Sequence, residues 1–299
     1  MPSILITGAN GFVGSYLARS AASQYRVIAT GSGPARVHFG PGVVYEPADI
    51  TDATQVESLV RKHRPDVLVH AAAISKPDVC EHDRALADRV NIDGTRYLLD
   101  AAAGFGTHFI FLSTDFVFDG KRGMYREEDP LGPVNYYGET KARAEAVVRQ
   151  YPGCWSIART VLVYGHPGGA RGNLLTLVDG ALRKGRPLRI FNDQLRTPTY
   201  VEDLADGLLR IAGRSAGGTW HLSGEEVRTP YQMAVETARH RGLDETLITP
   251  IKENDLQEPA KRPQKTGFDI SKAKQELGYA PVGFAEGLAR SFPEEKGRQ

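Results

Sequence analysis

The chain has few cysteines, no long apolar run and almost no net charge. Its 299 residues include two cysteines, Cys80 and Cys154, which are too few and too far apart for a disulfide framework or a zinc site, and no metal site is expected. No run reaches about 18 consecutive apolar residues, so no membrane-spanning helix is predicted. The 37 basic and 36 acidic residues give a net charge of +1, which favours neither nucleic acid nor a membrane as a partner. The first residues lack the basic region of a signal peptide, and we expect a cytoplasmic protein.

A glycine-rich turn near the start of the chain predicts a nucleotide site. Residues 3–7 form a short apolar run that is typical of a buried strand, and a helical pattern follows the glycines. Glycines at this point let the backbone approach a pyrophosphate, whose charge the N-terminus of the helix stabilises. The residues expected to bind the cofactor here are Gly8, Asn10, Gly11, Phe12, Val13 and Gly14.

The end of the second predicted strand indicates which nucleotide binds. Residues 26–30 are followed by a loop that contains Ser32 and Arg36 but no acidic residue. Enzymes that prefer NAD usually place a carboxylate here to hold the ribose 2′-hydroxyl, whereas an arginine accommodates a 2′-phosphate. The loop therefore favours NADP(H), although NAD(H) stays possible.

Two further predicted strands contribute cofactor contacts. A strand over residues 43–50 would bring Asp49 and Ile50 to the same sheet edge, where they would contact the adenine. A buried strand over residues 66–73 ends in three small residues, Ala71, Ala72 and Ala73. Small side chains at the carboxyl end of a central strand leave room for the cofactor backbone.

The order of the predicted elements indicates an α/β protein. Five alternations of strand and helix lead to the strand at 107–114, and another buried strand is expected over residues 154–165. This alternation predicts a Rossmann-type, doubly wound parallel sheet. We expect an NAD(P)-binding domain over 1–165 and a smaller substrate-binding lobe over 166–299, with segments near 188–225 returning to the first domain.

Tyr137 and Lys141 form a candidate catalytic pair. A helix that begins near Asn135 places residues four apart on one face, one turn from each other. An isolated phenol has a pKa of about 10, and a nearby ammonium favours the phenolate. We therefore expect the lysine to lower the pKa of Tyr137, which would then serve as a general acid or base.

Together these motifs resemble the extended short-chain dehydrogenase/reductases, and the resemblance covers nearly the whole sequence. The segments STDFVFDG, YREEDPLGPVNYYGETKARAE and NDQLRTPTYVEDLAD are similar to those of dTDP-4-dehydrorhamnose reductase and its relatives. The sequence departs from that branch at Phe116, where the reductases commonly have tyrosine.

The resemblance implies roles for individual residues. It makes Tyr137 the proton donor to a carbonyl oxygen that receives hydride, Lys141 a ligand of the nicotinamide ribose as well, and Thr114 a hydrogen-bonding partner of the same oxygen. Guanidinium groups suit a diphosphate because they pair bidentately and stay charged. The candidates for binding a nucleotide-sugar substrate are Asp115, Asn173, Arg196 and Arg262.

Three functions are compatible with these patterns. The first is an NADPH-dependent reductase of a nucleotide-linked 4-keto-6-deoxy sugar, and the second is an NAD-dependent sugar-nucleotide epimerase or dehydratase. The third is a non-catalytic regulatory protein, because the methionine adenosyltransferase beta subunit resembles the same branch. Proteins of this superfamily often form homodimers. His70 and His166 are expected to be structural residues and not metal ligands.

Overall fold

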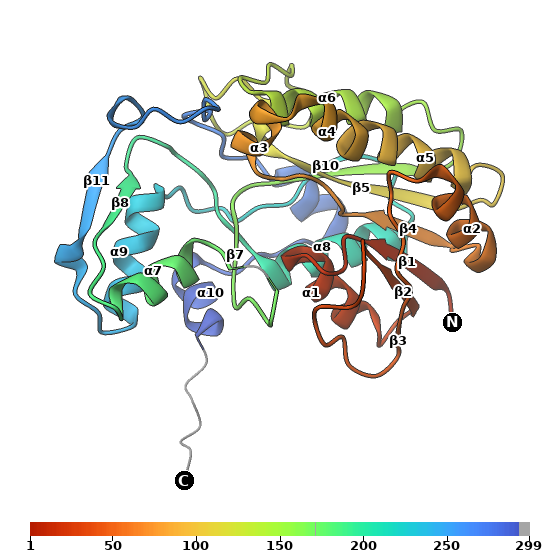
Figure 1. Cartoon of the computed structure of the whole chain (residues 1–299), viewed down its shortest axis with the longest axis horizontal. Coiled ribbons are helices and arrows are strands. Elements are labelled where there is room, and N and C mark those ends of the chain that lie inside the picture. Colours follow the sequence, from red (N-terminus) through yellow and green to blue (C-terminus); the bar gives the residue numbers. More distant parts are fainter. Residues whose placement is uncertain (171, 293–299) are drawn as a thin grey trace, which may run out of the picture.

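A seven-stranded parallel sheet forms the centre of the molecule (Figure 1). The computed structural model describes residues 1–170 and 172–292. The strands of this sheet are β1 (Ser3–Thr7), β2 (Arg26–Thr30), β3 (Val43–Tyr45), β4 (Val67–His70), β5 (His108–Thr114), β6 (Trp155–Thr160) and β10 (Gly218–His221). Their order in space is β10-β6-β5-β4-β1-β2-β3, and every neighbouring pair is parallel. Because the strand order reverses at β1 and β4, the carboxyl ends of these strands border the crevice where such sheets bind ligands. The predicted Rossmann-type fold is confirmed.

Helices cover both faces of the sheet, as Figure 1 shows. One face packs against α1 (Phe12–Ala21) and α8 (Val201–Arg214), and the other against α2 (Ala53–His63), α5 (Gly94–Ala102) and α6 (Tyr136–Val148). Neighbouring residues of β1 follow the twofold period of a strand: Ile4 and Ile6 belong to the first core and Leu5 to the second. The short helices α3 (Pro77–His82) and α4 (Arg84–Asp88) and a π-helical turn (Arg89–Asp93) lead into α5. Within the described residues, no helix is both long enough and apolar enough to cross a bilayer.

Local sequence signals fix the ends of the helices that flank the site. The side chain of Asp52 caps α2 by accepting hydrogen bonds from backbone N–H groups of the first turn. The same helix ends at His63. The next residue, Arg64, has a left-handed backbone with a φ of 39° and is followed by Pro65. At the start of α6, the Asn135 Oδ1 accepts from the N–H of Gly138 at 2.9 Å. The predicted helix start near Asn135 is therefore confirmed.

A smaller group of elements lies beside the main sheet and appears at the left of Figure 1. It contains α7 (Leu174–Leu182), β8 (Leu188–Phe191), α9 (Pro230–His240), β11 (Ile248–Ile251) and α10 (Phe284–Ser291). β8 and β11 form a parallel two-stranded sheet, and its apolar residues pack with those of α7 and α9. Another pair, β7 (Val163–Tyr164) and β9 (Thr199–Tyr200), connects this group to the Rossmann domain. Short helical turns complete the chain: Asp115–Val117, Glu245–Leu247, Glu253–Asp255 and the π-helical Ala273–Leu277.

The structure corrects two predicted segments. The strand expected over 43–50 ends at Tyr45, although the backbone N–H groups of Glu46 and Ala48 still donate to the carbonyl oxygens of Ala29 and Gly31 at 3.0 and 3.2 Å. The strand expected over 154–165 is two strands in different sheets, because Leu162 has a φ of 31° that interrupts it. Of the segments expected to return near 188–225, α8 and β10 lie against or within the main sheet, whereas β8 pairs with β11. The division into two domains at residue 165 stays a proposal.

Candidate functional site

The glycine turn between β1 and α1 forms a cradle that has no room for side chains. Gly8 has a φ of +69°, and a Cβ there would lie 2.7 Å from the backbone nitrogen of Ala72. A Cβ on Gly14 would lie 2.3 Å from the Gly8 carbonyl oxygen. Glycine is required at both positions, because Gly8 lies against the backbone that follows β4 and Gly14 lies against the backbone of the turn itself. Such a turn at a helix N-terminus fits a pyrophosphate.

The other predicted cofactor residues surround this cradle. Ala71, Ala72 and Ala73 follow β4 and are partly buried, with Ala71 and Ala72 against Gly8. Phe12 and Val13 occupy the first turn of α1, which Gly11 caps, while Ser32 and Arg36 are exposed on the loop after β2.

Asp49 and Ile50 lie after the end of β3 and not within a strand. The Asp49 carboxylate is exposed and accepts from the backbone N–H and hydroxyl of Thr51, at 2.9 and 2.8 Å. Ile50 is buried in the core on the face of the sheet that packs against α2 and α5. A Cβ on Gly94 would lie 2.9 Å from the Cδ1 atom of Ile50, so only glycine fits at that position. The role expected for this pair in covering the adenine stays a prediction.

The structure brings Thr114, Tyr137 and Lys141 together at the carboxyl end of β5. All three are buried, with 8%, 9% and 3% of their surface exposed. Burial raises the pKa of Tyr137, and a hydrogen bond with Thr114 opposes that shift. The phenol therefore stays protonated at neutral pH, which is the state that a proton donor needs.

Lys141 does not act on Tyr137 as the spacing predicted. Its Nζ donates to the Leu112 carbonyl oxygen at 2.8 Å and lies 3.8 Å from the centroid of the Phe111 ring. Burial lowers the pKa of Lys141 to about 7, and Glu145 opposes this shift. The expected lowering of the Tyr137 pKa is wrong for the protein without bound cofactor. Desolvation of the phenol has the largest effect and raises the pKa.

The sequence reasoning missed a buried ion pair behind Lys141. Glu145 is fully buried and follows Lys141 by one helical turn. It accepts from Arg159 at 2.9 and 2.8 Å and from the Ser113 hydroxyl at 2.7 Å. The pair joins α6 to β5 and β6, and the hydrogen bonds lower the pKa of the Glu145 carboxyl despite its burial. The i,i+4 spacing from Lys141 was the available signal.

A directed hydrogen-bond chain connects the glycine turn to α5. The Thr7 hydroxyl lies 2.7 Å from His70 Nδ1, and the Thr95 hydroxyl lies 3.1 Å from His70 Nε2. Thr95 donates to the Asn91 carbonyl oxygen at 2.7 Å and Thr7 accepts from the Ala72 N–H at 3.2 Å. Since Thr95 has used its proton, His70 must donate from Nε2 and accept at Nδ1. Burial lowers the pKa of His70 to about 3, and the prediction of a structural histidine is confirmed.

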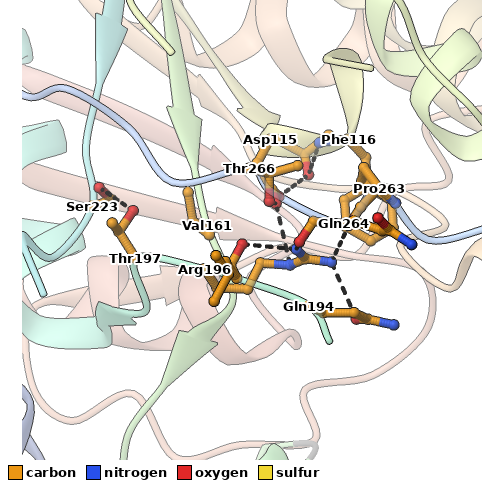
Figure 2. Close-up of polar contacts among 12 residues, drawn as sticks. Asp115, Phe116, Val161, Gln194, Arg196, Thr197, Ser223, Pro263, Gln264 and Thr266 are labelled. Atoms are coloured by element: carbon orange, nitrogen blue, oxygen red, sulfur yellow. Dashed lines mark hydrogen bonds and ion pairs between the residues drawn. The ribbon is translucent and has the colours of Figure 1, made fainter. Parts of the chain in front are cut away.

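Arg196 is enclosed in a network that Figure 2 displays. Only 3% of the residue is exposed. Its Nη1 donates to the Leu195 and Gln264 carbonyl oxygens, its Nη2 donates to the Pro263 carbonyl and to Gln194 Oε1, and its Nε lies 3.8 Å from Asp115 Oδ2. These contacts use the donors of Arg196 within the protein, and its expected role in binding a diphosphate stays a prediction.

Asp115 lies at the other end of the same network. The residue is 2% exposed, and its carboxylate accepts from the hydroxyls of Thr266 and, at 3.1 Å, Thr114. Burial raises the pKa of Asp115, while Arg196 and the hydroxyls oppose the shift. These contacts stabilise the loop that follows β5, and the expected contact of Asp115 with sugar hydroxyls stays a prediction.

The remaining substrate candidates also have protein partners. Asn173 caps α7, and its Nδ2 donates to the Gly165 carbonyl at 2.7 Å. Arg262 pairs with Asp78 of α3 through its Nη2 at 2.6 Å and donates to the Ala260 carbonyl at 2.7 Å. Asn173 thus stabilises the start of α7 and Arg262 joins its loop to α3, and the expected roles of both residues in substrate binding stay predictions.

Comparison with known proteins identifies relatives over the full length of the chain. The chain is 34% identical to dTDP-4-dehydrorhamnose reductase of Streptomyces griseus over 99% of its own length and 95% of that protein. It is 30% identical to methionine adenosyltransferase 2 subunit beta of Pongo abelii, over 99% of this chain and 90% of that protein. The fold matches a crystal structure of dTDP-4-dehydrorhamnose reductase from Bacillus anthracis in complex with NADP, with a TM-score of 0.85, 27% identity and coverage of 98% and 99% of the two chains.

The match to a family model extends over the Rossmann domain and the smaller lobe alike. Residues 1–296 match the model described as RmlD substrate binding domain. The cradle, the buried Thr114, Tyr137 and Lys141, and the strand order all lie within this range. The chain belongs to the RmlD substrate binding domain family.

Proposed function

We propose that the protein reduces the keto group of a nucleotide-linked 4-keto-6-deoxy sugar with NADPH, and that Tyr137 supplies the proton. The observation that carries this proposal is the buried group of Thr114, Tyr137 and Lys141 beside the glycine cradle. The full-length similarity to dTDP-4-dehydrorhamnose reductase of Streptomyces griseus supports the same substrate class.

The cofactor would bind across the carboxyl ends of the central strands. Gly8 and Gly14 allow the close backbone packing that forms the turn, with Ala72 against Gly8, and the pyrophosphate would lie at this turn, at the N-terminus of α1. When bound, NADPH supplies the hydride that converts the keto carbon to a CH–OH group. Ser32 and Arg36 are exposed after β2, where they would meet a ribose 2′-phosphate, and this supports NADPH over NADH.

Tyr137 is in the protonation state that reduction requires. Burial raises its pKa, so the phenol carries its proton at neutral pH and delivers it as charge develops on the carbonyl oxygen. The Lys141 side chain would bind the nicotinamide ribose and offset the charge left on the phenolate. The Thr114 hydroxyl donates to Asp115 at 3.1 Å, and it would redirect this single proton to the reacting oxygen when the substrate binds.

A substrate panel with one conservative variant tests this function. Consumption of NADPH is followed by absorbance with dTDP- and UDP-linked 4-keto-6-deoxy sugars, and NADH is assayed in parallel. Tyr137→Phe should lower kcat by about 100-fold to 10,000-fold and leave the Kd for NADPH nearly unchanged, because it removes only the hydroxyl. Tyr136→Phe is the matched control, since the Tyr136 hydroxyl donates to Asp88 at 2.9 Å instead.

Each outcome discriminates between the candidate functions. Unchanged turnover in Tyr137→Phe would refute the proposed proton donor. Conversion of a sugar nucleotide without net consumption of NADPH would instead identify an epimerase or dehydratase.

A regulatory role is the second candidate, and the 30% identity to methionine adenosyltransferase 2 subunit beta favours it. In that case the protein would bind NADP(H) yet reduce no member of the panel. It would change the kinetics of a methionine adenosyltransferase catalytic subunit when the two are mixed. Tyr137→Phe would leave that effect intact, because no proton transfer is involved.

Three further expectations belong to this proposal. The cysteines Cys80 and Cys154 are both free, which supports a reducing compartment such as the cytoplasm. The division at residue 165 would separate cofactor binding from substrate binding. A homodimer is proposed from the superfamily resemblance alone, and sedimentation measurements test it.

A further inference from the structure

Tyr45 has contacts that neither the core nor the catalytic group explains. It is the last residue of β3, and its ring stacks on Phe39 at a centroid distance of 5.6 Å and an interplanar angle of 14°. Its hydroxyl lies 2.8 Å from the Gly33 carbonyl oxygen and 3.1 Å from that of Gly31. A single proton thus serves two carbonyl groups of the loop that follows β2.

Asn10 binds the same loop from the glycine cradle. Its Nδ2 donates to the Tyr45 hydroxyl at 2.8 Å and to the Pro34 carbonyl at 3.1 Å, and its Oδ1 accepts from the Arg36 N–H at 2.8 Å. The Pro34 carbonyl and the Arg36 N–H fix the orientation of the amide, because exchanging its oxygen and nitrogen would break both of these bonds. We call Asn10 and Tyr45 the loop clamp.

The clamp leaves little space at Gly31. A Cβ there would lie 3.3 Å from Asn10 Nδ2 and 3.4 Å from the Tyr45 hydroxyl. In dinucleotide-binding domains that prefer NAD, an acidic residue lies about 20 residues after the glycine motif, and Gly31 has that position relative to Gly11. A carboxylate side chain at Gly31 would therefore displace the clamp.

The clamp also leaves two side chains free to meet a phosphate. Ser32 and Arg36 are exposed while the main chain at Arg36 is held by Asn10. Within residues 1–170 and 172–292, Arg36 makes no ion pair. A hydroxyl and an unpaired guanidinium on a fixed backbone suit a phosphate monoester.

We infer that Tyr45 and Asn10 are specificity-determining positioning residues, which select NADP(H) by holding residues 31–36 in a phosphate-accepting arrangement. The inference rests on the cofactor preference proposed above. Holding the loop in advance removes part of the ordering cost of binding. The gain applies to a nucleotide with a 2′-phosphate and hardly to one without.

Direct binding of NADP⁺ and NAD⁺ to the full-length protein tests this inference without requiring turnover. Tyr45→Phe retains the ring that stacks on Phe39 but removes the hydroxyl. It should raise the Kd for NADP⁺ by about threefold to tenfold and change the Kd for NAD⁺ by less than about twofold. Asn10→Ala removes the other member of the loop clamp. It should also reduce the ratio of the NADP⁺ affinity to the NAD⁺ affinity. Tyr25→Phe is the matched control, since Tyr25 precedes β2 at its opposite end.

The results separate failure of the inference from failure of the proposed function. If the unmodified protein binds NAD⁺ as tightly as NADP⁺, the proposed cofactor preference is wrong. The unmodified protein could instead prefer NADP⁺ while both clamp variants keep its full ratio of NADP⁺ affinity to NAD⁺ affinity, or bind both nucleotides more weakly by the same factor. In either case only the inference is overturned. Thermal unfolding of each variant identifies a general loss of fold, which would weaken both nucleotides together.

Discussion

Replacing Arg196 by methionine should destabilise the fold strongly. Methionine retains much of the side-chain volume but removes every donor, which leaves Asp115 buried without its cationic partner. Removing one member of a buried ion pair costs about 3–5 kcal/mol. The carbonyl groups of Pro263 and Gln264 would also lose a donor, so the upper part of this range applies.

The loss is measured by urea and thermal unfolding, followed by circular dichroism. In a chain of this size we expect the Tm to fall by about 6–10 °C. The difference in unfolding free energy between Arg196→Met and the unmodified protein should become smaller as the pH is lowered from 8 to 5. Burial already raises the pKa of Asp115 and Arg196 opposes that shift, so loss of the guanidinium raises the pKa further, and a protonated carboxyl needs no counter-charge.

A partly exposed arginine nearby supplies the control. The backbone of Arg228 pairs with that of Arg196, but its side chain is 27% exposed and contacts Glu226 and Glu236. Arg228→Met should therefore cost no more than about 1 kcal/mol. If Arg196→Met unfolds like the unmodified protein and only raises the KM for the nucleotide sugar, Arg196 is a substrate clamp and the reasoning is refuted.

Two other predictions concern Lys141 and Asn173. Burial lowers the folded-state pKa of Lys141 to about 7, below its unfolded value of about 10.4. The unfolded state therefore binds more protons between these values, and the contribution of Lys141 to stability rises with pH across that window. Unfolding free energies of Lys141→Met and the unmodified protein, measured at pH 7 and 9.5, should differ in slope, and equal slopes would contradict the assignment. Asn173→Ala removes the cap of α7 and should cost about 1 kcal/mol in urea unfolding. Asn173→Ser keeps a capping oxygen without placing a carboxylate against the Gly165 carbonyl and should recover part of this loss; no loss in Asn173→Ala would exclude a capping role.

The sequence by itself determined the features that depend on neighbours along the chain. Alternating apolar strands and helical patterns predicted the parallel sheet, and the glycines at 8, 11 and 14 predicted the turn in which two of them exclude a Cβ. The i,i+4 spacing placed Tyr137 and Lys141 on one face of α6, and both are buried there. These predictions succeeded because helix period, strand period and glycine geometry are local properties of the backbone.

Only the tertiary structure decided what each charged group contacts. Arg196 was a candidate substrate contact in the sequence, and only folding shows that it lies against Asp115 and the 263–264 backbone, where its donors are used. Lys141 was expected to lower the pKa of Tyr137, yet burial has the larger effect and raises it. Desolvation and partner choice depend on contacts between residues that are distant in sequence, and no local pattern encodes them.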